Sequence, residues 1–600
     1  MGRTHPVPSL LAVTALVALA LAGRPSADLP PETTDPAEAE QWNQAWDDYA
    51  TQPLDPRSAR RDELVDLPGA DDSLAATIAG AGSSSPSDFL APYLRIDRLP
   101  RMTWRTRASL ADPDAADRWR RAATHGRFRF TDGDAWDGGL VIERDSGEPG
   151  VVDYASGALG YRSADGRRTF VLGHARAHVG TGLLASRAGV PWLSLDAVRP
   201  RSPSLSATLA ATESGEPFGA ATLLRGDRWD LLVLVARPRW DATMDTVRGV
   251  ATTLRTDGTH VTNAERRARH VLAEERALVH AGWMPADGAY LGASAVLSRF
   301  SMPVRLALVA TKPTRRLAFL GVDARLDGAA WSAWGEAVRD ARGSAGLVAG
   351  AEYRLLPATL VLAGWSYDPT LVLPYGAGWS FRGEATDEQA VLAGLRLHRG
   401  RFRAEALGAR WRQTHATRLD SLPREGRWEE VRLGWREGRG IALSARWKQK
   451  ATWQPGLGGA AERARSEWLA ECTLSRGRWT VRPRIDVVDA DPAGSGVLAG
   501  ARVAADIAPQ LALGAHLAAY RSTDADAALY LYDLRAPGYG AISGLYDTGI
   551  AWGVRLGSGP LAGARGRAAR IAWSLAFSGT ARRGRGSDLA LTAQIDVGWP

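Results

Sequence analysis

The sequence has almost no cysteine and, after its first residues, no long apolar run. Cys472 is the single cysteine among 600 residues, which excludes an internal disulfide framework and a multi-cysteine metal site. We expect Cys472 to be a small wall residue of the fold. Beyond the N-terminus no apolar stretch approaches the ~18 residues that a spanning helix needs. With 23% charged residues, the chain cannot be a helical membrane bundle.

The net charge of +8 comes largely from arginine. A basic soluble protein would suggest nucleic acid as a partner. Here, however, the basic residues are scattered rather than clustered; Arg482 and Arg484, for example, alternate with Val481 and Ile485. A solvated lumen, or arginines that face lipopolysaccharide, explains this pattern as well as nucleic acid does.

The N-terminus has the pattern of an exported protein. Residues 1–22 predict a signal peptide, with a short apolar core and the small-x-small sequence Ala20-Leu21-Ala22 at its end; Ala27 is a second candidate cleavage point. Residues 23–35 form an acidic, proline-containing leader. We therefore expect the mature chain to leave the cytoplasm.

The last residues alternate strictly between two faces, which predicts a β-strand. One face is apolar and ends in Trp599, and two earlier segments repeat the pattern, with Trp573 and Trp552 on their apolar faces. A charge-free face that carries tryptophan from strand to strand resembles the lipid-facing side of a transmembrane β-barrel. Barrels of the outer membrane commonly end on an aromatic residue; here Pro600 follows Trp599.

Residues 101–600 continue with short strand-like segments separated by Gly, Pro, Asp and Asn, without regularly intervening helices. This excludes a parallel α/β architecture. At roughly 20 residues per strand and turn, the region predicts a large antiparallel transmembrane β-barrel of roughly 20 to 26 strands, with an even number favoured. The fold class is therefore mainly β, with a small all-α domain before the barrel.

That small domain is expected at residues 36–100, where Trp42, Trp46 and Tyr49 recur at helical spacing. The run from Asp62 to Ala70, followed by Leu74, Ala75 and Ile78, resembles the helix-hairpin-helix motif of competence-type DNA receptors. The resemblance implies that the turn contacts a DNA phosphate, and the matching turn residues are Leu67, Pro68, Gly69 and Ala70. Asp71 and Asp72 stand where the family has a second glycine, and two carboxylates repel an anion. A periplasmic protein partner is the alternative to DNA.

One segment inside the barrel region favours a helix. Thr262 and Asn263 can cap a helix over residues 264–280, with Glu265 in its first turn. Such a helix is either a solvated loop excursion or a constriction of the lumen. For the second case the candidate gate residues are Arg266, Arg267, Arg269 and Arg276.

A second resemblance covers residues 138–221. Its motifs are Asp145-Ser146-Gly147-Glu148, Val152 to Gly157, Leu172-Gly173-His174, Val179 to Leu183, and Glu216 to Ala220. Their order is similar to that in a family of bacterial outer-membrane proteins that join a helix-hairpin-helix region to a large β-barrel. His174 and Ala175 replace the family's Asp-Tyr pair, and the resemblance supplies no activity.

The chemistry-bearing residues form no catalytic arrangement, so we expect the protein not to be an enzyme and to need no cofactor. His174 and His178 share one strand face but lack a carboxylate partner in the motif. Asp145, Glu148 and Asp153 cluster in a turn region and could bind Ca²⁺. Gly180-Thr181-Gly182 is too short for a phosphate loop, and we expect these glycines to mark a bulge or bend in a strand.

Together these observations predict a monomeric barrel of the outer membrane of a two-membrane bacterium, with residues 36–100 in the periplasm. The expected partners are outer-membrane lipid and lipopolysaccharide, with DNA or a periplasmic protein at the hairpin. The favoured function is a channel or transport component. The alternatives are a DNA-uptake component and a non-conducting docking barrel.

Overall fold

The structure is a computed structural model that describes most residues from 101 to 599. The gaps lie mainly in connections between strands, the longer ones at 112–121, 187–194, 210–214, 306–311, 417–421, 533–541 and 559–569. The predicted signal peptide, leader and helix-hairpin-helix domain, residues 1–100, lie outside the described residues and stay predictions.

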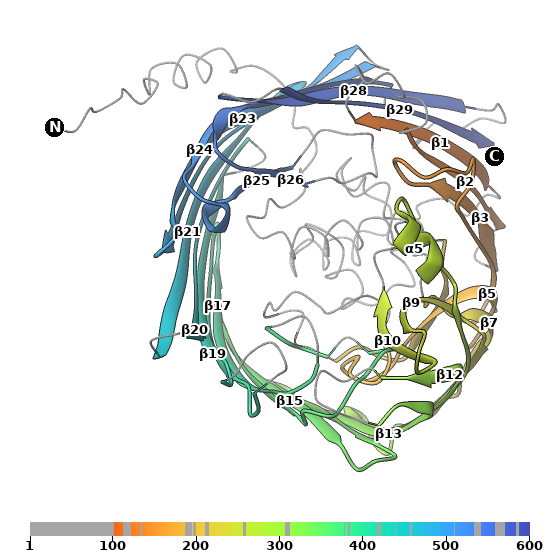
Figure 1. Ribbon diagram of the computed structural model, residues 1–600. Helices are drawn as coiled ribbons and strands as arrows, with labels where there is room; N and C mark the ends of the chain where they lie inside the picture. The colour runs from red at the N-terminus through yellow and green to blue at the C-terminus, as the bar shows by residue number, and fades with distance from the viewer. Residues whose placement is uncertain are drawn as a thin grey trace.

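The described chain forms a ring of antiparallel strands around a wide lumen (Figure 1). In chain order the ring strands are β1 (Arg101–Ala111), β2 (Ala123–Asp132), β3 (Trp136–Arg144), β4 (Tyr154–Arg162), β5 (Arg168–His178), β7 (Phe218–Arg225), β8 (Trp229–Ala236), β11 (Leu272–Trp283), β12 (Ala289–Val304), β13 (Thr314–Asp327), β14 (Trp331–Asp340), β15 (Ala345–Leu355), β16 (Ala358–Tyr367), β17 (Glu388–Arg399), β18 (Phe402–Arg412), β19 (Glu425–Glu437), β20 (Ile441–Gly456), β21 (Gly459–Arg476), β22 (Trp479–Asp491), β23 (Gly494–Ala508), β24 (Leu511–Ser522), β27 (Thr548–Gly557), β28 (Arg570–Arg582) and β29 (Ser587–Trp599).

The barrel is closed by its first and last strands. β1 pairs with β29 from Met102 opposite Trp599 to Ala111 opposite Ala590. In the part of the chain that the structure describes, the main sheet has 27 strands; without β6, β9 and β10, which branch from the ring, 24 strands close it. The predicted fold class of the barrel, its range of strand number and its even count are thus confirmed. Full closure leaves the wall without a free sheet edge.

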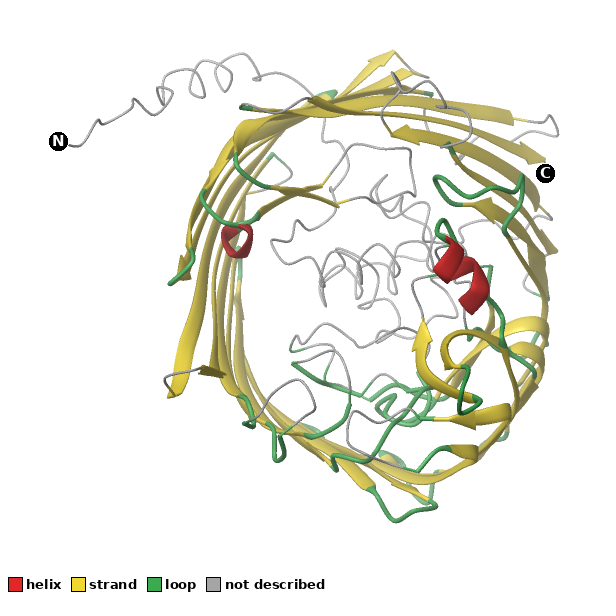
Figure 2. Cartoon of the chain, viewed as in Figure 1, coloured by secondary structure: helices red, strands yellow, loops and turns green. Residues whose placement is uncertain are grey.

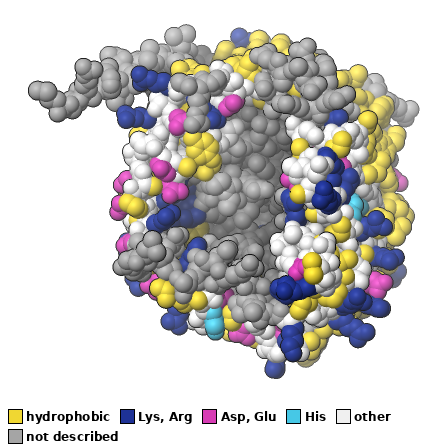
Figure 3. All heavy atoms as spheres, in the orientation of Figure 1, with side chains coloured by type: hydrophobic (Ala, Val, Ile, Leu, Met, Phe, Trp, Pro, Cys, Tyr) yellow, Lys and Arg dark blue, Asp and Glu magenta, His cyan; other side chains and the backbone are white. Residues whose placement is uncertain are grey.

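Alternation along each strand separates a lipid-type face from a lumen face. On β28 the side chains of Ile571, Trp573, Leu575 and Phe577 are exposed on the outside of the ring, whereas the intervening Ser574 and Ser578 are buried. Because successive side chains point to opposite sides, an apolar/small-polar period of two produces an apolar outer wall. Figure 3 shows hydrophobic side chains gathered along the outer edge beside β1 to β3.

Aromatic side chains lie at one end of the outer wall. Trp229 is paired with Trp283, and Trp331 with Tyr353, and all four are exposed. Two further pairs at the same end are Trp136 with Tyr161 and Phe402 with Trp435. Their amphipathic rings suit the boundary between hydrocarbon and headgroups, which is how aromatic girdles mark the membrane interface.

The two ends of the barrel differ in their connections. The end that carries the aromatic pairs, here the turn end, has connections such as 226–228 and 400–401. The opposite, loop end has connections such as 179–217 and 237–271. Outer-membrane barrels have short periplasmic turns and longer extracellular loops, and the two ends of this barrel differ in the same way.

The long loop-end connections contain the remaining elements. These are β6 (Ser204–Ala207), β9 (Arg239–Asp245), β10 (Val250–Arg255), α5 (Asn263–Ala268), η3 (Ala525–Ala527), β25 (Leu529–Tyr532) and β26 (Ile542–Leu545). Figures 1 and 2 show α5, β9, β10, β25 and β26 within the outline of the ring. No helix in the described part of the chain is long and apolar enough to cross a membrane.

The helix predicted over 264–280 is mostly wrong. The helix α5 ends at Ala268, and from Leu272 the chain is the wall strand β11, which pairs with β8 and β12. The inward residues of β11 are Leu272, Glu274, Arg276, Leu278 and His280. They follow a period of two, which is not apparent in the sequence because both faces of the strand carry apolar residues. The predicted cap is confirmed, since Thr262 and Glu265 form a capping box.

Candidate functional site at the loop end of the barrel

Three buried glutamates on the inner wall hold segments that fold into the barrel. Glu336, on β14, accepts hydrogen bonds from the backbone N–H groups of Thr181 (2.8 Å), Leu183 (3.1 Å) and Leu184 (3.0 Å). The Thr181 hydroxyl donates a fourth, at 2.7 Å. Successive N–H groups that converge on one anion form a nest, and Glu336 therefore fixes the segment 179–186 to the wall.

The nest corresponds to the Gly180-Thr181-Gly182 motif. The two glycines have φ values of 57° and 88°, in the left-handed region that a side chain disfavours. The motif follows β5 rather than lying in a strand, so its predicted position was wrong, although a sharp bend was rightly expected. Its anion is a side chain of the same protein.

Glu274 and Glu388 hold two other segments in the same way. Glu274 accepts hydrogen bonds from Trp240 Nε1 of β9 (2.7 Å) and from the Tyr375 hydroxyl (2.6 Å). Glu388 accepts hydrogen bonds from Trp365 Nε1 (2.7 Å), the Ser380 hydroxyl (3.0 Å) and the Phe381 backbone N–H (3.1 Å). The segments 179–186 and 368–387 and the strand β9 are thus each attached to a wall carboxylate.

Apolar packing supports these attachments. Trp379, 1% exposed, and Leu371, fully buried, belong to a core that includes Leu183 and the wall residue Trp365. Trp365 lies edge-on to Trp379, with 6.0 Å between ring centroids, and Ser186 donates its backbone N–H to the Tyr375 carbonyl. The inward segments therefore pack on one another as well as on the wall.

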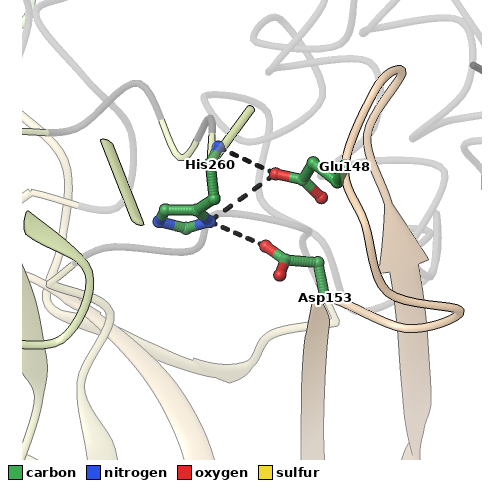
Figure 4. A group of neighbouring side chains, drawn as sticks. All are labelled: Glu148, Asp153 and His260. Carbon is green, nitrogen blue, oxygen red and sulfur yellow. Dashed lines mark hydrogen bonds and ion pairs between the residues drawn. The ribbon is translucent and has the colours of Figure 1, made fainter. Parts of the chain in front are cut away.

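A second cluster joins the loop-end connections to one another (Figure 4). His260 Nδ1 lies 2.7 Å from Asp153 Oδ2 and 3.6 Å from Glu148 Oε1, and Nε2 lies 2.7 Å from Asp241 Oδ2. The His260 backbone N–H also donates to Glu148 Oε1 at 2.8 Å. These four residues come from the 145–153 connection, from β9 and from the segment before α5, and we call them the mouth cluster.

Each carboxylate of the mouth cluster is fixed through its second oxygen. Asp153 Oδ1 accepts a hydrogen bond from the Arg269 guanidinium at 2.5 Å. Glu148 Oε2 accepts one from the Asp145 backbone N–H at 3.0 Å. Asp241 Oδ1 accepts one from the His270 backbone N–H at 2.7 Å. The side chains of His260, Glu148, Asp153 and Asp241 are between 0 and 6% exposed. The oxygens that face the imidazole are therefore preorganised.

The charges of the mouth cluster shift its protonation. Burial opposes the charged form of His260, but hydrogen bonds to Asp153 and Asp241 outweigh it and raise the pKa of the imidazole. Burial raises the pKa of Glu148, and this effect outweighs the hydrogen bonds from the backbone N–H groups of Asp145 and His260, which lower it. The pKa of Asp145 is raised first by burial and then by the nearby Glu143 and Asp153. The three carboxylates of the mouth cluster, Glu148, Asp153 and Asp241, outnumber the one arginine, Arg269, that pairs with it.

A third feature is a charged lumen lining across β17 to β23. Arg446 lies 3.7 Å from Glu430 and 3.6 Å from Glu467, and Arg484 lies 2.7 Å from Asp486. This lumen charge network, as far as the structure describes it, has the carboxylates Glu405, Glu430, Glu467, Glu471 and Asp486 and the cations Arg396, Arg403, Arg432, Arg446, Lys448, Lys450, Arg465, Arg482, Arg484 and Arg502. Arg482 and Arg484 thus lie in the lumen, one of the two locations expected for arginines.

The four candidate gate arginines do not form one group. Arg266 and Arg267 are exposed, and Arg266 bonds to the Val261 carbonyl and to Asn263. Arg269 binds Asp153 of the mouth cluster. Arg276 lies on the wall strand β11, paired with Glu274 at 2.8 Å and stacked 3.9 Å from the Tyr375 ring centroid. A helical gate made of these residues is therefore not formed.

The other predicted residues have separate outcomes. Leu67, Pro68, Gly69 and Ala70 lie outside the described residues, so their contact with DNA stays a prediction. Cys472 lies on the wall strand β21 opposite Leu443, as expected. His174 contacts the Gly157 backbone and the Phe218 ring rather than pairing with His178.

Sequence reasoning identified Asp145, Glu148 and Asp153 as a turn cluster but missed His260. Among the residues that the structure describes, the one grouping with metal-ligand spacing is Glu148, Asp153 and His260, whose ligand atoms lie within 4.8 Å of one another. His260 is more than a hundred residues from Glu148 in the chain, and Asp241 lies on another strand. No local motif could have joined them.

No family model matches the sequence, and no curated protein is similar to it. Some solved barrels resemble it at low identity. The siderophore receptor PirA from Acinetobacter baumannii is 8% identical, with a TM-score of 0.43. The match covers 84% of this chain and 81% of PirA. The FrpB iron transporter from Neisseria meningitidis is 9% identical, with a TM-score of 0.37 and coverages of 83% and 81%. Likenesses this distant carry no argument about a ligand, and the barrel is assigned from its own strand pairings.

Proposed function

We propose that this protein is a monomeric outer-membrane barrel that passes anionic solutes, with the inward segments at its loop end as the gate. The proposal assigns no catalytic step and no cofactor to the chain. The observation that carries it is the lumen charge network, in which cations outnumber carboxylates. A lining of one dominant charge attracts ions of the opposite sign and repels ions of the same sign.

The arrangement of the carboxylates supports a conducting role over a docking role. Glu430, Glu467 and Asp486 each pair with arginines of the lining, so they orient the guanidinium groups without neutralising the whole set. An excess of cations along the inner wall, beyond the carboxylates that hold the inward segments, suits a path for anions.

The outer wall supports lipopolysaccharide as the partner of the loop end. Arg237, Arg299 and Arg316 line a depression of about 1160 Å³ on the outer face, together with one carboxylate, Glu275, and the apolar side chains of Val235 and Leu297. Basic side chains above an apolar band match a lipid with phosphate groups above acyl chains.

The test is ion selectivity in a planar lipid bilayer with a salt gradient across it. We expect a steady conductance whose reversal potential indicates anion selectivity. Replacing Arg446→Gln together with Arg502→Gln is expected to move the reversal potential toward zero. The control is Arg167→Gln, an exposed turn-end arginine that pairs with Asp227, which is expected to leave selectivity unchanged. No conductance, or cation selectivity in the unmodified protein, would contradict the proposal.

A further inference from the structure

The mouth cluster groups one imidazole nitrogen and two carboxylate oxygens closely enough for a single metal ion to contact all three. Both ring nitrogens of His260 face carboxylate oxygens at 2.7 Å. A neutral imidazole has one N–H and one lone pair. If Nε2–H donates to Asp241, a positive charge is needed between Nδ1 and the oxygens of Asp153 and Glu148, and either a second proton or a metal ion supplies it.

The arrangement around Nε2 is the one that orients metal-binding histidines. A histidine that binds a metal through one ring nitrogen usually donates the other N–H to a carboxylate, which fixes the tautomer and the ring orientation. Asp241 Oδ2 is in that position, and Asp241 is itself fixed by the His270 backbone. Nδ1 is thereby directed at Asp153 and Glu148.

The spacing and charge of the cluster fit a small divalent ion. Ligands held at about 2.0 to 2.2 Å around a tetrahedral ion lie roughly 3.3 to 3.6 Å apart. Nδ1 lies 3.6 Å from Glu148 Oε1 and 2.7 Å from Asp153 Oδ2, so the first separation already fits and the second has to widen. When His260 is neutral, as a metal ligand must be, Glu148, Asp153 and Asp241 have three negative charges against the single positive charge of Arg269, and a divalent cation balances the remaining two.

We propose that His260 Nδ1, Glu148 Oε1 and Asp153 Oδ2 bind a divalent transition-metal ion of the Zn²⁺ class, with Asp241 as the residue that positions His260. An imidazole ligand favours such ions over Ca²⁺, which takes oxygen ligands alone. The ion joins the 145–153 connection to the segment before α5, so it fastens two loop-end segments together. This inference does not depend on whether the barrel conducts.

The test uses the full-length, untagged protein in detergent, stripped with a chelator and titrated with Zn²⁺ against a chromophoric competitor. We expect uptake of one Zn²⁺ ion per chain that His260→Gln abolishes. Asp241→Asn, which keeps the shape of the side chain, is expected to weaken binding by about 10- to 100-fold, the usual effect of losing such a partner. The matched control is His415→Gln, because His415 is an exposed histidine 3.6 Å from Asp387 at the same end of the barrel.

Co²⁺ gives a second measurement, since its visible absorption reports the ligands directly. The unmodified protein and the His415→Gln variant are expected to give the same Co²⁺ spectrum, which His260→Gln removes while heat-modifiable migration on a gel shows an intact barrel. The proposal is overturned if the unmodified protein takes up no more Zn²⁺ than the folded His260→Gln variant. Equal affinity for Ca²⁺ and Zn²⁺ would also overturn it, because that result removes the imidazole from the ligand set.

Discussion

At the scale of single residues, buried carboxylates organise the loop end. Glu336 receives its donors from a segment more than 150 residues away in the chain, Glu274 receives donors from Trp240 and Tyr375, and Glu388 receives donors from Trp365 and from residues just before it. A buried charge is costly unless hydrogen bonds compensate it, so each glutamate stabilises the position of its segment only as long as the donors are in place. The interaction is therefore specific as well as stabilising.

Replacing Glu336 with glutamine tests this role. The amide NH₂ of Gln would face at least one backbone N–H of the nest, and leaving such a buried donor unpaired costs about 1 to 3 kcal/mol. We expect Glu336→Gln to speed hydrogen exchange of the amides of residues 181–184 while the wall strands keep their protection. The control is Glu352→Gln on the adjacent strand, since Glu352 pairs with Arg354 of its own strand at 3.3 Å. Equal exchange in both variants would show that Glu336 does not hold the segment.

At the scale of elements, the loop-end connections fold inward and are fastened at several points. The segment 368–387 is attached through Tyr375, Trp379 and Phe381 and also near its beginning, where the Ser344 and Thr370 hydroxyls lie 2.7 Å apart. In the proposed function this segment has to move for solute to pass. Restricting it should therefore change conductance.

A disulfide can restrict the segment because the chain has a single cysteine. In a Cys472→Ser background, we expect Ser344→Cys and Thr370→Cys to form a disulfide on oxidation. The disulfide should lower the conductance, and its reduction should restore it. Single-channel recording before and after adding a reductant measures the effect. Ser344→Cys alone is the control and should not respond to the reductant. If the bridged protein, verified by mass spectrometry, conducts like the reduced one, the segment is not a gate.

At the scale of the whole molecule, the barrel presents an apolar outer wall and a charged inner one. Leu517 is exposed at the middle of β24, whereas Ile441 is exposed at the turn-end start of β20. The cost of an arginine on a lipid-facing wall depends on depth, because only the middle of the bilayer lacks water and headgroups.

We expect Leu517→Arg to destabilise the folded barrel in lipid vesicles by about 2 to 4 kcal/mol, and Ile441→Arg by about 0 to 1 kcal/mol. Denaturant titration of tryptophan fluorescence in vesicles measures both values. The two substitutions add the same charge, so their difference reports depth alone. Similar costs at the two positions would contradict the assigned membrane-spanning face.

The sequence by itself determined the wall of this protein. Period-two alternation requires only neighbouring residues, and the segment 571–577 showed its lipid-type face without reference to any partner strand. The same reasoning failed at β11, where apolar residues on both faces hid the alternation and a helix was expected. Thr262 and Glu265 were identified correctly because a helix cap is also a local arrangement.

Only the tertiary structure decided the contents of the loop end. His260, Asp241 and Glu148 meet because the barrel brings two separate connections, 145–153 and 237–271, to the same rim, and Gly180-Thr181-Gly182 finds its anion on a strand some 150 residues later. Alternation specifies which face a side chain occupies, but it contains no information about which distant residue lies opposite. The physical reason is that the wall is built from contacts within and between adjacent strands, whereas the site is built from contacts between loops.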